Sequence, residues 1–143
     1  MRGHELAMAL RAAYLAMHRL TDAQLASSRV TADQFVVLAT LANGDAVSQN
    51  ELVARTASDP NTLRAMLVLL ERRKLIERKP HPTDGRARSV SLTRKGKSTF
   101  QKLWQASEMV RKQLSSALPP SETDKLLQSL KHIVAILTNT PYR

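Results

Sequence analysis

The chain has 143 residues, enough for one domain with its own core, because single domains most often contain roughly 100–150 residues. Apolar residues make up 43% of it and aromatic residues only 3%, which excludes a disordered composition and predicts a core of aliphatic side chains. The net charge is +10 and there is no cysteine, which excludes a disulfide scaffold, a zinc–thiolate site and a cysteine redox switch.

No apolar run in the sequence approaches the roughly 20 residues that span a bilayer. The N-terminal segment is interrupted by Glu5, Arg11 and Arg19, and it lacks the apolar region of a signal peptide. We therefore expect a cytoplasmic protein that does not contact a membrane.

The positive charge is concentrated in one part of the chain. Between Arg55 and Lys97 there are twelve basic and four acidic residues, which carry +8 of the net +10. A local excess of this kind indicates a polyanionic partner. The alternative is a solvated basic face with no partner.

Sequence patterns typical of helices occupy most of residues 5–73. Apolar residues recur at three- and four-residue steps from residue 5 to about 27. Capping boxes at 31–34 and 48–51, and an Asp-Pro pair at 59–60, then predict helices over about 32–42, 49–57 and 60–73. The last two are joined by only a few residues and the second is basic, which is typical of a helix-turn-helix.

A β-hairpin is predicted directly after these helices. Residues 75–79 form a short strand that we expect Pro80 to end, and residues 88–93 alternate between polar and apolar with period two. The Pro, Asp and Gly residues between them favour a turn. A hairpin that follows a helix-turn-helix is a wing, and the predicted fold class is mainly α with a small β-wing.

The C-terminal third predicts one long helix from Thr93 to the Pro-Pro pair at 119–120, and a last helix from Ser121. These helices and the first one each have an apolar stripe. They would either pack within one chain or, as we favour, interleave with a second copy, since two-fold dimers are the usual way to match two half-sites.

The sequence resembles the MarR family of winged helix-turn-helix transcriptional regulators along essentially its whole length. Its segment D-G-R-A-R-S-V-S-L-T-R-K-G at 84–96 matches the family's wing signature D-x-R…L-T-x-x-G, and L-E-R-R-K-L-I-E-R at 70–78 matches L-E-x-x-x-L-I-x-R. The resemblance implies a single domain over 1–143, with the winged helix-turn-helix at 31–96 and dimerisation helices at 1–30 and 97–143. It also implies a homodimeric repressor that binds a palindromic operator in double-stranded DNA and that a small molecule releases.

The sequence departs from the family at two positions. Lys74 stands where a glycine is usual, so it must adopt a left-handed conformation or close the helix differently. Ala65 occupies a frequent arginine position, with Arg64 one residue earlier.

The first turn of the helix that begins after Asp59 is the part expected to enter a major groove. It carries Asn61, Thr62 and Arg64, and asparagine and arginine can each form two hydrogen bonds with a base. For Asn61 and Thr62, capping and turn formation are the alternative roles. Arg64 is less easily explained that way.

Three further residues are candidates for phosphate contacts. Ser48 opens the preceding helix, where free N–H groups can hold a phosphate, although capping alone would also explain it. Arg94 and Lys95 are expected to position the protein on the phosphate backbone without reading sequence.

The wing supplies the remaining candidates. We expect Arg86 to enter the narrow minor groove of A·T-rich DNA, and the family resemblance implies that Asp84 orients its guanidinium. Arg88 lies closer to the strand and more plausibly meets phosphate. Solubilising charge is the alternative for these arginines.

Effector binding is expected in the crevice between the terminal helices and the winged segment. The family resemblance implies aromatic acids or phenols as effectors, and Tyr14, His18 and Trp104 are the amphipathic side chains placed to line such a crevice. Their alternative role is ordinary core or interface packing.

No enzyme or cofactor signature accompanies these features. The four histidines lie in separate segments, no ligand pair of the H-x-x-x-H type is present, and there is no phosphate-binding glycine loop. We expect no metal, no cofactor and no catalysis. The alternative to a regulator is a winged-helix module that binds RNA or another protein without operator specificity.

Overall fold

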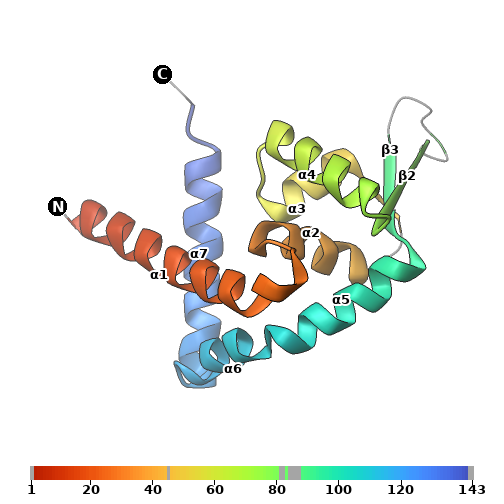
Figure 1. The fold of residues 1–143 in the computed structure, drawn as a ribbon. Helices are drawn as coiled ribbons and strands as arrows, with labels where there is room; N and C mark the ends of the chain where they lie inside the picture. The colour runs from red at the N-terminus through yellow and green to blue at the C-terminus, as the bar shows by residue number, and fades with distance from the viewer. Residues whose placement is uncertain (1, 45, 81–82, 84–87, 142–143) are drawn as a thin grey trace. The chain divides into compact units, whose positions relative to one another are not determined.

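The computed structural model describes residues 2–44, 46–80, 83 and 88–141. The chain forms two compact units, Met1–Ser107 and Glu108–Arg143, which are described separately below. Figure 1 shows the course of the chain.

The first unit has the order of elements expected of a winged helix-turn-helix preceded by a long helix. Its helices are α1 (Arg2–Leu25), a 3-10 turn η1 (Ala26–Ser28), α2 (Ala32–Ala42), α3 (Gln49–Thr56), α4 (Pro60–Arg72) and α5 (Arg94–Ala106). Its strands are β1 (Val47–Ser48), β2 (Ile76–Pro80) and β3 (Arg88–Leu92). The mainly helical fold class with a small wing is confirmed, and α2, α3 and α4 begin where the capping residues predict.

Side-chain caps explain these helix starts. The Thr31 hydroxyl accepts a hydrogen bond from the Gln34 amide at 3.1 Å, and the Gln34 side chain accepts one from the Thr31 amide at 3.2 Å, which completes a capping box. At Ser48 the hydroxyl accepts from the Glu51 amide at 3.1 Å. The Glu51 carboxylate lies 3.6 Å from the Arg55 guanidinium, so it supports the helix by an ion pair one turn further on.

The three strands form one antiparallel sheet in the order β1-β3-β2. Val47 pairs with Val90, and Ile76 pairs with Leu92, so buried aliphatic side chains from all three strands lie on one face. Strand β2 ends at Pro80, as the sequence predicts, and Pro80 is itself the last residue of the strand, where it pairs with Arg88. An edge strand tolerates proline because one side of its backbone needs no sheet partner.

The core of this unit packs α2, α3 and α4 against the sheet and α5. Leu63, Leu67 and Leu70 of α4 are fully buried, and Met66 packs partly buried against the same cluster. Leu38 and Leu52 complete the contact with α2 and α3. The opposite face of α4 is thereby left to solvent.

The end of α4 confirms one of the two conformations expected for Lys74. Its φ is 61°, which is left-handed. The Lys74 amide donates to the Glu71 carbonyl at 2.9 Å and the Leu75 amide donates to the Leu70 carbonyl at 3.0 Å, the two bonds of a Schellman motif. A lysine therefore occupies the position at which glycine closes helices without strain.

The start of α5 is fixed against this helix end. The Thr93 hydroxyl donates to the Lys74 carbonyl at 2.6 Å and accepts from the Gly96 amide at 2.9 Å. A Cβ at Gly96 would overlap the Leu75 carbonyl oxygen and lie 2.9 Å from the carbonyl carbon. The signature L-T-x-x-G thus includes two residues that fix the start of α5 against the junction of α4 and β2.

The prediction of one long helix from Thr93 to residue 118 is wrong. The helix ends at Ala106, and α6 (Glu108–Ser116) begins after a break at Ser107. The Ser107 hydroxyl bonds to the carbonyls of Leu103 at 2.7 Å and Trp104 at 3.3 Å. A serine that bonds back to its own helix competes with the backbone ladder and favours a bend or break.

The second unit consists of α6 and α7 (Pro120–Thr138). Helix α7 starts one residue before the predicted Ser121, and it has no buried residue. Several of its large apolar side chains are exposed: Leu126, Leu127, Val134, Ile136 and Leu137. No helix among the described residues is long and apolar enough to cross a membrane.

Candidate nucleic-acid interface

A three-residue link joins α3 to α4 and sets the start of the predicted recognition helix. Ala57 has a left-handed φ of 52°, and the Ser58 amide donates to the Val53 carbonyl at 3.2 Å. The chain then reaches Asp59, whose carboxylate caps α4. This turn gives α4 a defined first residue, Pro60, and so defines which side chains face solvent.

The first turn of α4 presents the predicted DNA-contacting residues to solvent. Asn61, Thr62 and Arg64 are all exposed, while Leu63 between them is fully buried. The Arg64 guanidinium lies 3.5 Å from the Asn61 side-chain oxygen, so these two groups are neighbours on one exposed surface. Both can reach a ligand outside the helix.

Thr62 and Ser48 each take part in a helix cap. The Thr62 amide and hydroxyl donate to the same Asp59 carboxylate oxygen at 3.1 and 3.2 Å. Ser48 is half-buried and accepts from the Glu51 amide. These are the capping roles that the sequence offers as alternatives, and at an exposed helix start they leave room for phosphate contact.

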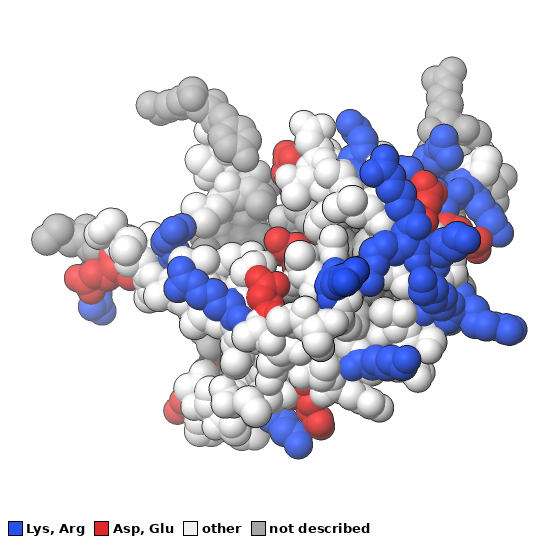
Figure 2. Space-filling model, viewed as in Figure 1, with Lys and Arg blue, Asp and Glu red and all other residues white. Residues whose placement is uncertain are grey.

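Lys and Arg side chains gather on one side of the molecule. Figure 2 shows them over the region where Figure 1 places the end of α4, the hairpin strands and the start of α5. Among the predicted phosphate contacts, Arg88, Arg94 and Lys95 are exposed. Arg72, Lys74, Lys79 and Lys97 extend the same exposed basic surface. We call this set of seven residues the basic surface.

Lys95 has a second, structural contact that the sequence does not reveal. Its ammonium donates to the Arg73 carbonyl at 3.1 Å at the end of α4. The Arg73 guanidinium in turn donates to the carbonyls of Arg29 at 2.8 Å and Ser28 at 3.3 Å. Cations near a helix C-terminus stabilise it, so part of the basic excess supports the fold.

Glu71 and Arg78 form a two-bond ion pair between α4 and β2. The guanidinium donates to the carboxylate at 2.9 and 3.2 Å. The hydrogen bond from Arg78 lowers the pKa of Glu71 below its usual 4.5, against a smaller opposing effect of burial, and Arg88 adds a further attraction. The hydrogen bond from Glu71 likewise raises the pKa of Arg78. The pair ties the predicted recognition helix to the wing.

The predicted wing-tip residues Asp84 and Arg86 lie outside the described residues. Arg88 begins β3, where it pairs with Pro80 of the edge strand. Arg88 therefore stands at the end of the paired strands that leads into residues 81–87, within electrostatic reach of Glu71.

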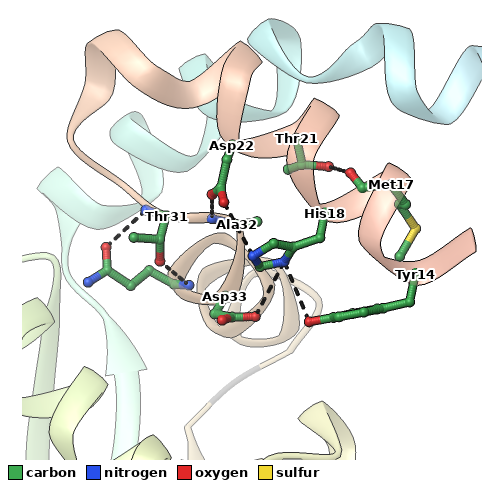
Figure 3. A network of polar contacts seen from close by, with 9 residues as sticks. Tyr14, Met17, His18, Thr21, Asp22, Thr31, Ala32 and Asp33 are labelled. Atoms are coloured by element: carbon green, nitrogen blue, oxygen red, sulfur yellow. Dashed lines mark hydrogen bonds and ion pairs between the residues drawn. The ribbon is translucent and has the colours of Figure 1, made fainter. Parts of the chain in front are cut away.

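Two of the three predicted effector residues lie together, as Figure 3 shows. The Tyr14 hydroxyl is 3.5 Å from His18 Nδ1, and His18 Nε2 is 3.2 Å from the Asp22 carboxylate. The other Asp22 oxygen accepts from the Ala32 amide at 2.6 Å, which joins α1 to the start of α2. Asp33 Oδ1 lies 3.9 Å from His18 Nδ1.

Trp104 belongs to a different cluster. Its ring centroid is 5.7 Å from that of Phe100 and 6.4 Å from that of Phe35. Trp104, on α5, therefore lies against Phe35 of α2 and Phe100 of its own helix, and it remains 45% exposed.

A pocket of about 390 Å³ lies beside Tyr14 at the helix-turn-helix link. It is lined by residues of α1, α2, the end of α3, the link and α4: Tyr14, Asp33, Val36, Thr56, Ala57, Ser58, Asp59, Thr62 and Met66. In the parts of the chain that the structure describes, no group of three or more His, Asp or Glu residues is arranged to hold a metal ion.

Known proteins share both the sequence pattern and the fold. Residues 30–87 match the model of the MarR family. The HTH-type transcriptional repressor NicR of Pseudomonas putida is 28% identical over 125 residues, which cover 87% of this chain and 79% of that protein.

Solved structures agree with this match. The transcriptional repressor CouR bound to a 23-mer DNA duplex superposes with a TM-score of 0.78 and 28% identity, covering 90% of this chain and 92% of that one. Bordetella bronchiseptica BpsR, whose DNA binding is regulated by 6-hydroxynicotinic acid, superposes with a TM-score of 0.79 and 28% identity, covering 91% and 98%. The chain is thus similar to the MarR family over residues 30–87 and to these regulators along most of its length.

Proposed function

We propose that this protein is a homodimeric DNA-binding transcriptional regulator, a repressor that a small molecule releases from a palindromic operator. The observation that carries the proposal is the exposed first turn of α4, where Asn61 and Arg64 are free to meet base edges. The basic surface on the same unit supplies the charge that binding to a polyphosphate backbone requires.

We assign different roles to the two groups of residues. Asn61 and Arg64 read bases in the major groove, since each can form a bidentate pair. Thr62, Ser48, Arg94, Lys95 and Arg88 position the protein on phosphates. Arg86, oriented by Asp84, is proposed to enter the minor groove from the wing tip.

The relatives support this function and its control by a ligand. NicR is a transcriptional repressor and CouR is a repressor seen on a DNA duplex. DNA binding by BpsR is regulated by 6-hydroxynicotinic acid, an aromatic acid. By analogy, Tyr14, His18 and Trp104 remain our candidates for contacts with an aromatic effector.

The terminal segments 1–30 and 97–143 are proposed to form the dimer around the winged segment 31–96. Exposed apolar residues occur on both sides of that segment: Leu6, Met8 and Met17 on α1, and Leu126, Val134 and Leu137 on α7. Exposed apolar side chains in such numbers mark an interaction surface. We further propose that the protein acts in the cytoplasm, as a regulator without catalytic activity.

Footprinting on the DNA that flanks the protein's own gene tests the function. The expected result is protection of a palindromic segment, with much weaker binding to random duplex and to RNA of equal length. Salt dependence alone does not discriminate, because any basic protein shows it. Equal affinity for RNA and for every duplex would instead support the RNA-binding alternative.

A further inference from the structure

The pocket at the helix-turn-helix link has a composition that selects one class of ligand. It is bounded by α1 and α2 on one side and by the link and the first two turns of α4 on the other. Its volume of about 390 Å³ lies within the usual range for small-molecule sites of roughly 300–1,000 Å³. A ligand there would contact the predicted recognition helix directly.

The charged groups that line this pocket are carboxylates. Asp33 and Asp59 line it, and none of its described lining residues is Lys or Arg. The Asp33 side chain is 57% exposed, and a basic group, His18 Nδ1, lies 3.9 Å from its Oδ1. Asp59 caps α4 through Oδ2, and among the described contacts its Oδ1 accepts no hydrogen bond. Both carboxylates therefore retain acceptor capacity toward the pocket.

The rest of the lining combines apolar and aromatic side chains with the hydroxyl residues Thr56, Ser58 and Thr62. Tyr14, Val36 and Met66 line the pocket together with Ala57. The face of a tyrosine ring attracts a cation, and the aliphatic side chains favour a flat apolar body. In a chain of net charge +10, this pocket is a local site of negative charge.

We propose that this pocket binds a small organic cation with an apolar body, such as an aromatic amidinium or ammonium. The inference rests on the proposed function, since it names the ligand class that would control DNA binding. The two carboxylates disfavour an aromatic acid at this place, because like charges repel and His18, beside Asp33, is the one basic group within 4 Å of either in the described contacts.

The position of the pocket supplies a route to control. A cation bound between Asp33 and Asp59 joins the start of α2 to the first turn of α4. The start of α2 is itself held to α1 by the bond from the Ala32 amide to Asp22, as Figure 3 shows. Occupancy thus fixes α4 relative to α1 and α2, and it changes DNA affinity to the extent that the two conformations bind the ligand differently.

A charge series on one scaffold tests the ligand class without DNA. Benzamidinium, benzamide and benzoate have nearly the same shape and carry charges of +1, 0 and −1. We expect benzamidinium to bind the full-length protein with a Kd on the order of 1 mM, as suits a ligand of this size, measured by calorimetry. Benzamide should bind at least about tenfold more weakly, since the charge-assisted bonds are lost, and benzoate should not compete.

Charge-removing variants locate the site. Asp59→Asn keeps a good N-cap and removes the charge, and Asp33→Asn removes the charge within the first turn of α2. Each should weaken benzamidinium binding about tenfold. Asp124→Asn, an exposed carboxylate of α7, is the matched control and should leave the Kd unchanged.

The proposal is overturned if benzoate binds as tightly as benzamidinium, if benzamidinium shows no saturable binding in the millimolar range, or if all three variants behave alike. Folding of each variant is checked by its thermal transition. Because no DNA is present, these outcomes leave the DNA-binding function to be judged by its own footprint.

Discussion

Arg64 is the residue on which base recognition most depends in this account. It is exposed on the first turn of α4, next to Asn61. The next residue, Ala65, occupies the position at which the family frequently has arginine. Replacing Arg64 by Ala should weaken operator binding by about 1–3 kcal/mol, the size of one good bidentate base pair. Fluorescence anisotropy at fixed salt measures the change.

The matched variant Arg64→Lys separates charge from base reading. Lysine keeps the positive charge but lacks the planar fork. We expect it to retain binding to random duplex while losing most of the discrimination for the operator. If Arg64→Lys discriminates as well as the native protein, Arg64 contributes only charge.

The ion pair of Glu71 with Arg78 should make the stability of the fold depend on pH. Since folding lowers the pKa of Glu71 below 4.5, the pair stabilises the fold above that pH, and the contribution is lost as the pH falls through the folded-state pKa. Glu71→Gln should therefore reduce the free energy of unfolding at neutral pH, with the difference from the native protein shrinking in acid. Urea unfolding from neutral pH to about pH 3 tests this. A difference that stays constant over that range would show that the carboxylate charge is irrelevant.

At the scale of elements, the left-handed Lys74 stores strain at the junction of α4 and β2. A non-glycine residue in this conformation costs roughly 1–2 kcal/mol of folding free energy. Glycine avoids that cost, but its greater entropy in the unfolded state costs about 0.5–1 kcal/mol. Lys74→Gly should thus stabilise the fold by about 0.5–1 kcal/mol in chemical denaturation. Lys74→Ala, which keeps the Cβ, is the control and should show no gain. Equal stability of the two variants would mean that the turn is unstrained.

Elements defined by local signals were predictable from sequence. The Thr31, Ser48 and Asp59 caps depend on residues within three positions of each other, so their helices begin where the sequence indicates. The break at Ser107 was not predictable, since its apolar stripe continues across the break and only the hydroxyl's bonds to its own helix reveal the change.

Contacts between elements were the least predictable part of the site. Arg78 reaches Glu71 across seven positions, and Lys95 reaches the Arg73 carbonyl across twenty-two. The two residues of each pair lie in, or cap, different elements, so the periodicity of one helix or strand does not reveal the contact. The acidic pocket is of the same kind, because Tyr14, Asp33 and Asp59 come together only through the packing of α1, α2 and the link. The exposed residues of α4 were predictable because a buried stripe fixes the opposite face.

At the scale of the whole molecule, the exposed apolar side chains of α1 and α7 predict a homodimer. Light scattering at micromolar concentration should give twice the mass of one chain, which is 15.9 kDa. Val134→Glu places a charge among the exposed apolar residues of α7 and should weaken the dimer. Asn50→Glu on α3, an exposed position outside the proposed dimerisation segments, serves as control. A folded native protein with the mass of one chain would contradict the dimer.

The central claim is that two copies of α4 read one symmetric DNA sequence, and selection from random-sequence duplexes tests it most directly. The account predicts enrichment of a two-fold symmetric site whose half-site centres lie about one helical turn, roughly 10–10.5 base pairs, or a multiple of it apart. Two chains should bind each selected duplex, and Arg64→Ala should lose the preference for it. Failure to enrich any sequence, or equally tight binding of the selected duplex, random duplex and RNA, would contradict the account.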